Sequence, residues 1–150
     1  MTREIAAPAE RVWALVADLP RMGEWSPENE GATWRDDATG PAAGARFVGR
    51  NRNGAKRWTT DGVVVDADPG RLFSFRITVK GVKVAEWRYA LEPTATGCRI
   101  TETWTDRRNA LAKLVGGRVS GVSDRRTHNR ATMEATLDRL KAAAEAASSS

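Results

Sequence analysis

The sequence predicts an α+β fold in which a curved antiparallel β-sheet wraps around a long C-terminal helix, with two short helices near the N-terminus. Three patterns support this prediction. Apolar residues recur at helical spacing close to the N-terminus and again close to the C-terminus. Between them, from Gly31 to Arg107, short runs rich in Val, Thr, Phe and Trp are separated by Gly, Pro, Asn and Asp. Because no helical pattern lies between these runs, consecutive strands are expected to pair antiparallel.

The first helix is predicted over Pro8–Ala17. Proline fits the first helical turn, where its missing N–H is not needed. Apolar residues then follow at helical spacing, at Val12, Leu15 and Val16. A proline and a glycine end this pattern, and Met22 and Trp25 give the next segment an apolar side. We therefore expect one irregular helical turn there.

Six strands are predicted in the central region. They are Ala32–Arg35, Ala45–Asn51, Trp58–Asp66, Leu72–Val79, Val84–Glu92 and Cys98–Asp106. Turns between strands are predicted at Asn53-Gly54, Asp68-Pro69-Gly70, Lys80-Gly81 and Thr96-Gly97. The even spacing of these runs favours a meander.

A long helix is predicted from about Asp124 to Ala147. Its apolar residues form one narrow stripe, at Met133, Leu137, Leu140 and Ala144. Such a helix needs a concave apolar surface, and the sheet is the available candidate. We expect one domain over residues 1–147, because 150 residues is close to the usual size of one domain. Ser148–Ser150 is expected to be a disordered tail.

Composition excludes several classes of protein. Hydrophobic residues make up 41% of the chain and charged residues 29%, which excludes wholesale disorder and a membrane-embedded chain. Apolar runs such as Val63-Val64-Val65 are far too short to span a bilayer. The N-terminus shows no export signal, so a cytoplasmic location is expected. The basic residues behind the net charge of +5 are scattered among acidic ones, so no nucleic-acid partner is expected.

Five stretches resemble one family of proteins. They are IAAPAERVWALVAD (Ile5–Asp18), WSP (Trp25–Pro27), WRYALEP (Trp87–Pro93), GCRITETW (Gly97–Trp104) and ATLDRLKAAAE (Ala135–Glu145). In this order they resemble the polyketide cyclase/dehydrase and lipid-transport branch of the SRPBCC superfamily, also called START-like or birch-pollen-allergen-like. The resemblance implies a helix-grip fold and a first strand that pairs with the last, for which little room exists before Pro8. Because the superfamily includes transport proteins, cyclases, hydrolases and co-chaperones, the fold alone does not fix an activity.

Strand phase predicts which side chains face a cavity between sheet and helix. Alternate residues of a strand point to the same face, and the apolar phase identifies the inner face. We expect the ligand-binding cavity to be bordered by Trp25, Phe73, Phe75, Trp87, Tyr89, Ile100 and Trp104. An ordinary core is the equally good alternative, and in a helix-grip cavity the two interpretations coincide.

Two carboxylates are candidate catalytic residues. The phase that puts Cys98 and Ile100 inside also puts Glu102 inside, and a buried carboxylate needs a partner or stays protonated. Asp61, in phase with Val63, is expected as a second polar group of the wall. Either residue is suited to bind a ligand hydroxyl or to act as a general acid or base. The alternative is that Glu102 lies at the sheet rim and pairs with an arginine.

The long helix adds two candidates for ligand binding, Arg126 and Arg130, which lie within about 20° of the apolar stripe. They are expected to pair with Glu102 or to bind a ligand carboxylate, with a solvent-directed orientation as the alternative. His128, the only histidine, falls about 180° from the stripe and is expected to be exposed and dispensable. With one histidine and one cysteine, Cys98, no metal site and no cofactor are expected.

The leading interpretation is a protein that binds an apolar small molecule or lipid between sheet and helix. One alternative is an enzyme of the polyketide cyclase/dehydratase type that uses a cavity carboxylate, and another is an interaction module with a vestigial pocket. Ala110–Gly121 is expected to act as a lid, because Leu111, Leu114 and Val115 give it one apolar side next to glycines. A plain connector is the alternative.

Overall fold

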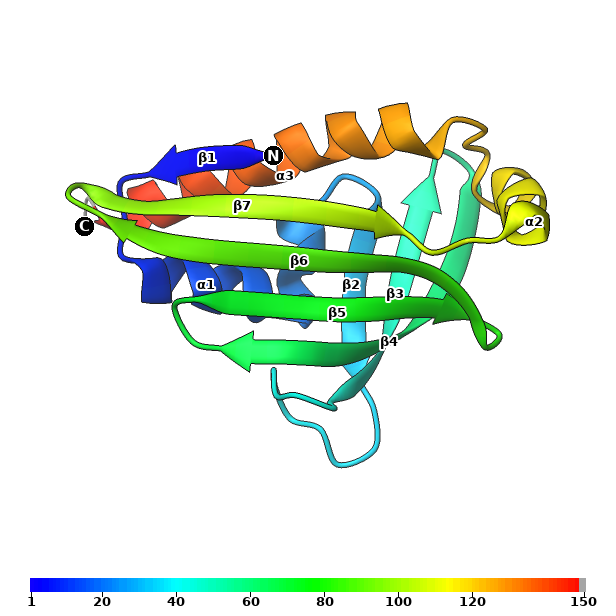
Figure 1. Cartoon of the computed structure of the whole chain (residues 1–150), viewed down its shortest axis with the longest axis horizontal. Helices are drawn as coiled ribbons and strands as arrows, with labels where there is room; N and C mark the ends of the chain where they lie inside the picture. Colours follow the sequence, from blue (N-terminus) through cyan, green and yellow to red (C-terminus); the bar gives the residue numbers. More distant parts are fainter. Residues whose placement is uncertain (149–150) are drawn as a thin grey trace.

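The computed structural model describes residues 1–148. In that part of the chain it contains seven strands, three α-helices and one 3₁₀ helix (Figure 1). In chain order they are β1 (Thr2–Ile5), α1 (Ala9–Ala17), η1 (Leu19–Glu24), β2 (Asn29–Trp34), β3 (Arg46–Asn53), β4 (Lys56–Asp68), β5 (Leu72–Val79), β6 (Val82–Thr94), β7 (Gly97–Asp106), α2 (Ala110–Ser120) and α3 (Arg125–Ser148). The predicted α+β fold is confirmed.

The strands form one antiparallel sheet in the order β1-β7-β6-β5-β4-β3-β2. Strands β2 to β7 follow one another as a meander. The short β1 pairs with β7, with Ile5 opposite Cys98, so the segment before Pro8 forms a four-residue edge strand. In Figure 1, β5, β6 and β7 run along the long axis of the molecule, whereas β2 and β3 turn almost across it. This curvature gives the sheet a concave face.

The hairpin between β5 and β6 has the turn that the sequence predicts. Both turn residues, Lys80 and Gly81, have left-handed backbone angles, with φ of 49° and 80°. Two such residues form a type I′ turn, whose twist matches that of the strands. The tight turn lets both strands run to its edge, so β6 begins at Val82 instead of the predicted Val84.

Helix α1 and the C-terminal half of α3 fill one end of the concave face. Trp13 of α1 packs edge-on against Phe73, with ring centroids 6.2 Å apart. Its indole N–H donates to the carbonyl of Leu72 at 2.8 Å. Leu137 and Leu140 of α3 have no exposed surface, and α3 packs against α1 and β1. The predicted apolar stripe of α3 is therefore buried here.

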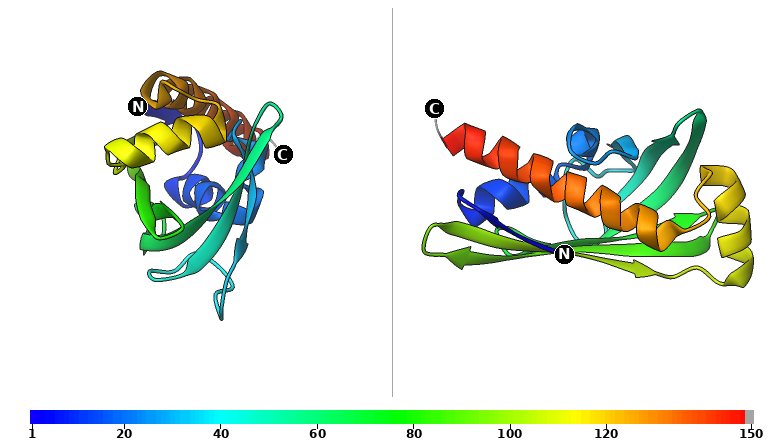
Figure 2. Two further views of the ribbon diagram at one scale, coloured as in Figure 1. Left: turned by 90° about the vertical axis from the view of Figure 1, so that its right-hand side faces the viewer. Right: turned by 90° about the horizontal axis from the view of Figure 1, so that it is seen from above.

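The other end of the molecule carries α2 and the N-terminal half of α3 (Figure 2). Asn109 caps the N-terminus of α2. At its C-terminus the Asn53 amide donates to the Ser120 carbonyl at 2.8 Å, and the Lys56 ammonium donates to the Arg118 carbonyl at 2.6 Å. The predicted lid segment is thus a helix whose C-terminal end is held by the β3–β4 hairpin.

None of the helices within residues 1–148 is long and apolar enough to cross a membrane. The predicted tail, Ser148–Ser150, starts at the last residue of α3, and Ser149-Ser150 lies outside the described residues.

Candidate functional site

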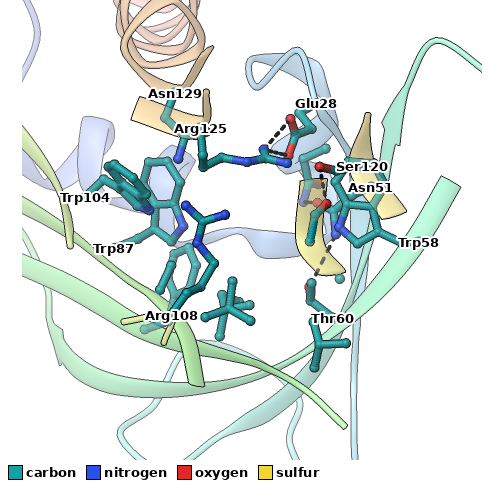
Figure 3. Close-up of a pocket in the computed structure, with 18 of the residues that line it drawn as sticks. Glu28, Asn51, Trp58, Thr60, Trp87, Trp104, Arg108, Ser120, Arg125 and Asn129 are labelled. Atoms are coloured by element: carbon teal, nitrogen blue, oxygen red, sulfur yellow. Dashed lines mark hydrogen bonds and ion pairs between the residues drawn. The ribbon is translucent and has the colours of Figure 1, made fainter. Parts of the chain in front are cut away.

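A cavity of about 450 Å³ lies between the sheet, α2 and the N-terminal half of α3. This volume falls within the range of about 300–1,000 Å³ that is typical of small-molecule sites. Figure 3 shows Trp87 and Trp104 on one side of the cavity and Trp58 on the other. Much of the remaining lining is also apolar, including Phe47, Phe75, Ile77, Val84, Leu111, Val115 and Val119.

An aromatic row crosses the concave face. Phe75, Trp87 and Trp104 lie opposite one another on neighbouring strands, and Val64 extends the row onto β4. The rings of Trp87 and Trp104 have centroids 6.5 Å apart. Of the predicted ligand-binding residues, these three aromatic residues and Tyr89 line the cavity. The strand phase predicted for β5, β6 and β7 is therefore correct.

Glu102 lies in the cavity wall with only 1% of its surface exposed. It is opposite Tyr89, whose hydroxyl donates to Glu102 Oε1 at 2.8 Å. Oε2 has no hydrogen-bond partner in the described part of the chain. The partner of Glu102 is thus a tyrosine and not the arginine considered from the sequence.

Burial controls the ionisation of this pair. Burial raises the pKa of Glu102 from its ordinary 4.5 to about 7, although the hydrogen bond from Tyr89 acts in the opposite direction. Burial also raises the pKa of Tyr89 well above its ordinary value, so this hydroxyl remains a donor at neutral pH. The cavity wall therefore contains a carboxyl group that gains or loses its proton near neutral pH and has one oxygen without a hydrogen-bond partner in the described part of the chain.

The face of α3 that borders the cavity differs from the prediction. Arg126 and Arg130 are exposed and do not line the cavity. The lining residues are instead Arg125, Asn129, Thr132 and Thr136, which repeat at helical spacing about 100° away from the apolar stripe. In the second half of α3 the apolar stripe packs against α1 and β1. This packing fixes the rotation of the helix, so that in its first half the neighbouring polar face borders the cavity.

Arg125 joins a cluster of charged groups at the edge of the cavity. Its Nη1 donates to both carboxylate oxygens of Glu28, at 2.7 and 2.8 Å. Its guanidinium lies 5.9 Å from the ring centroid of Trp58. His128 Nε2 also contacts Glu28, at 2.6 Å. His128 is thus half-buried, with 31% of its side chain exposed, and not on a fully exposed face as predicted, because η1 and the start of β2 bring Glu28 beside α3. Its dispensability stays a prediction.

A second arginine enters the cavity just after β7. Arg108 forms a two-pronged ion pair with Asp106, with both nitrogen–oxygen distances at 2.9 Å. Only 12% of its side chain is exposed. Figure 3 shows Arg108 and Arg125 reaching into the same space from different elements. Sequence reasoning missed Arg108, which stands in a loop where no periodicity indicates direction.

Three predicted cavity residues are packed in the core instead. Trp25, Phe73 and Ile100 are almost completely buried and do not line the cavity. They face inward, as predicted, but they lie where α1, η1 and the second half of α3 fill the concave face. The cavity is therefore confined to the end of the sheet near α2.

Asp61 is not a cavity residue. On β4 the inward positions are Thr60, Gly62 and Val64, since Thr60 lines the cavity and Val64 is 1% exposed. Gly62 lies directly under the ring of Phe47, which also faces the cavity. Asp61 belongs to the opposite phase and points to the outer face of the sheet. The second catalytic candidate is therefore removed.

Fold and cavity together define a class of protein, a helix-grip domain with a pocket between a curved sheet and its C-terminal helix. The chain belongs to the polyketide cyclase/dehydrase and lipid transport family, whose model matches residues 1–145. The family resemblance of the sequence is confirmed. A search of curated protein sequences finds no match.

Solved structures support this assignment. The solution structure of a Polyketide_cyc-like protein from Corynebacterium glutamicum is 32% identical, with a TM-score of 0.63, over 94% of this chain and 86% of that one. The di-domain ARO/CYC protein StfQ from the steffimycin biosynthetic pathway has a TM-score of 0.76 at 16% identity, over 100% of this chain and 51% of that one. A protein from Nitrosomonas europaea has a TM-score of 0.70 at 14% identity, over 100% and 95%. The last two matches concern the fold alone.

Proposed function

We propose that this protein binds a hydrophobic small molecule or lipid in the cavity between its sheet and α3. The observation that carries the proposal is a cavity of about 450 Å³ whose walls are mainly aromatic and aliphatic. Burial of apolar ligand surface against Trp58, Trp87 and Trp104 supplies the affinity. Glu102, with its unpaired oxygen, provides a polar anchor for a ligand hydroxyl. Membership of a lipid transport family agrees with this function.

A pair of adjacent residues on β4 offers a test. Thr60 lines the cavity, whereas Thr59 is exposed on the opposite face of the strand. Binding of the neutral apolar dye N-phenyl-1-naphthylamine is measured by its own fluorescence. The indole of Thr60→Trp occupies cavity space, so we expect dye binding to weaken at least about tenfold, a loss of about 1.4 kcal/mol. Thr59→Trp adds the same indole outside the cavity and is expected to bind like the wild type.

Two results of this test would contradict the proposal. One is that the wild type shows no saturable dye binding. The other is that Thr60→Trp and Thr59→Trp bind the dye equally well. Circular dichroism of both variants establishes that they are folded, so that a lost cavity is not confused with a lost fold.

The ionisation of Glu102 favours one second candidate, an enzyme of the polyketide cyclase/dehydratase type. A general acid–base catalyst works best when its pKa lies near the working pH, and the pKa of Glu102 is about 7. Native mass spectrometry of the purified protein would reveal a co-purified small molecule. A carrier releases that molecule unchanged, whereas an enzyme converts it. If the protein is an enzyme, Glu102→Gln is expected to lose turnover but to retain binding.

The open cavity argues against the third candidate, an interaction module with a vestigial pocket.

We propose further that α2 acts as a lid. Leu111 and Val119 line the cavity mouth yet are 69% and 47% exposed, so apart from the two hydrogen bonds at its C-terminal end few side-chain contacts hold this helix against the sheet. Amide exchange across Leu111–Val122 is expected to be fast in the empty protein and at least about tenfold slower with an apolar ligand bound. The amides of Val12 and Val16 in the core helix α1 serve as internal controls. Exchange that is slow in both states would indicate a fixed connector.

A further inference from the structure

The exposed apolar surface of this protein is concentrated at one place. Within the described residues, all large apolar side chains that are strongly exposed belong to α2 or to the β5–β6 turn: Val82, Leu111, Leu114, Val115 and Val119. Their exposed fractions range from 45% to 69%. Exposed apolar groups scattered singly over a surface are ordinary, but a contiguous patch marks an interaction site. Here the patch surrounds the cavity mouth, because all but Leu114 also line the cavity.

The charges of the two segments that carry this patch have one sign. From Arg107 to Ser123 the sequence contains four basic residues and no acidic one, and from Thr78 to Ala85 it contains two lysines and no acidic residue. Four of these six, Lys80, Lys83, Lys113 and Arg118, form no ion pair in the described part of the chain. The rest of the chain contains 18 basic and 19 acidic residues, so its charges nearly balance.

The segment that contains α2 and the segment that contains the β5–β6 turn lie at the same end of the molecule. The left view of Figure 2 looks onto this end and shows α2 lying across it. The sheet places the β5–β6 turn at this end too, since Val79, Lys80 and Val82 line the same cavity as α2. Apolar side chains surrounded by unpaired positive charges are the arrangement that binds an interface between anionic lipid headgroups and acyl chains.

We propose that the cavity mouth docks onto membrane surfaces that contain anionic phospholipids. Val82 and the apolar residues of α2 insert among the acyl chains just below the headgroups, while Lys80, Lys113 and Arg118 contact lipid phosphates. Positive charge complements the negative surface of such a bilayer, which a neutral protein partner would not require. Docking in this orientation places the cavity opening against the bilayer. The inference rests on the surface itself and not on the presence of a ligand in the cavity.

Co-sedimentation with lipid vesicles tests the proposal. The full chain is mixed with vesicles of phosphatidylcholine alone or of phosphatidylcholine mixed with the anionic lipid phosphatidylglycerol. We expect binding to the second kind only, and we expect it to weaken as salt rises, since the Debye length shortens from about 10 Å at 0.1 M to about 3 Å at 1 M.

Two double variants separate the apolar and the electrostatic contributions. Leu111→Ser with Leu114→Ser removes apolar side chains that are already exposed, so folding is unaffected, and binding is expected to fall at least about tenfold. Lys113→Gln with Arg118→Gln is expected to weaken binding about 30-fold. The matched control is Arg35→Gln with Arg139→Gln, which removes two exposed charges elsewhere and is expected to change binding less than about threefold.

Several results would overturn the proposal. The first is that the protein sediments with neither kind of vesicle. The second is that the Lys113/Arg118 variant and the Arg35/Arg139 control lose vesicle binding to the same extent, because net charge alone would then explain binding. If instead the protein dimerises in solution, binds no vesicle and becomes monomeric in the double leucine variant, the patch binds a second copy of the chain. Vesicle binding without any dye binding would leave the docking surface intact and contradict the proposed ligand site.

Discussion

Replacing Gly62 by alanine is expected to destabilise the fold by about 1–3 kcal/mol, although it adds a single methyl group. The added Cβ would lie 2.1 Å from Cζ of Phe47, far inside van der Waals contact. Phe47 cannot easily move away, because its ring packs edge-on against Trp34 at 6.0 Å and against Phe75 at 5.6 Å. Urea unfolding of the variant and the wild type measures the difference in free energy.

Gly40 provides the control for this substitution. A Cβ at Gly40 meets nothing within 4 Å, so Gly40→Ala should be neutral or stabilise the protein by up to about 1 kcal/mol. A double-mutant cycle with Phe47→Leu locates the strain, since Gly62→Ala should cost much less once the ring is gone. If Gly62→Ala is as stable as Gly40→Ala, the phase of β4 described above is wrong and Asp61 faces the cavity after all.

The error on β4 shows where sequence patterns lose information. On β5, β6 and β7, polar and apolar residues alternate, so Phe75, Trp87 and Glu102 could be placed on the inner face directly. On β4, three consecutive valines fit either phase, and the glycine that marks the inner face has no side chain to indicate it. A register shift between Val64 and Asp66 disturbs the alternation further.

Helix α3 shows a different limit. Its apolar stripe predicted correctly the face that packs in the core. The face that borders the cavity is polar and consists of Arg125, Asn129, Thr132 and Thr136, at the same spacing of four, three and four residues. Such a stripe resembles an ordinary solvent-exposed face in sequence. Only the position of the helix relative to the sheet shows that this face closes a cavity.

The extent of the cavity is likewise a tertiary property. Phe73 and Phe75 share one strand and one face, yet Phe73 packs against Trp13 whereas Phe75 borders open space. The difference depends on where α1 ends above the sheet, which no local pattern contains. Strand phase therefore predicts inward residues, and helix positions decide which of them remain available to a ligand.

The stability of the wild-type protein is expected to fall by about 2–3 kcal/mol between pH 5 and pH 8 because of Glu102 alone. Burial raises the pKa of this group from 4.5 to about 7. Below pH 4.5 the carboxyl group is protonated in both the folded and the unfolded chain. As the pH rises toward 7, the unfolded chain releases the proton while the folded chain retains it, so the free energy of unfolding decreases. Above pH 7 both states are ionised and the loss is complete.

Glu102→Gln should remove this dependence. The glutamine side chain has the same shape and still accepts the hydrogen bond from Tyr89, but it carries no charge at any pH. We therefore expect the variant to exceed the wild type in stability by about 3 kcal/mol at pH 8, and by less than about 1 kcal/mol at pH 5. Glu134→Gln, the same chemical change at an exposed position of α3, should follow the wild type at every pH. Urea unfolding of the three proteins from pH 5 to pH 8 decides the question. Parallel curves for Glu102→Gln and the wild type would mean that Glu102 is already ionised at pH 5, and a general acid–base role near neutral pH would lose its physical basis.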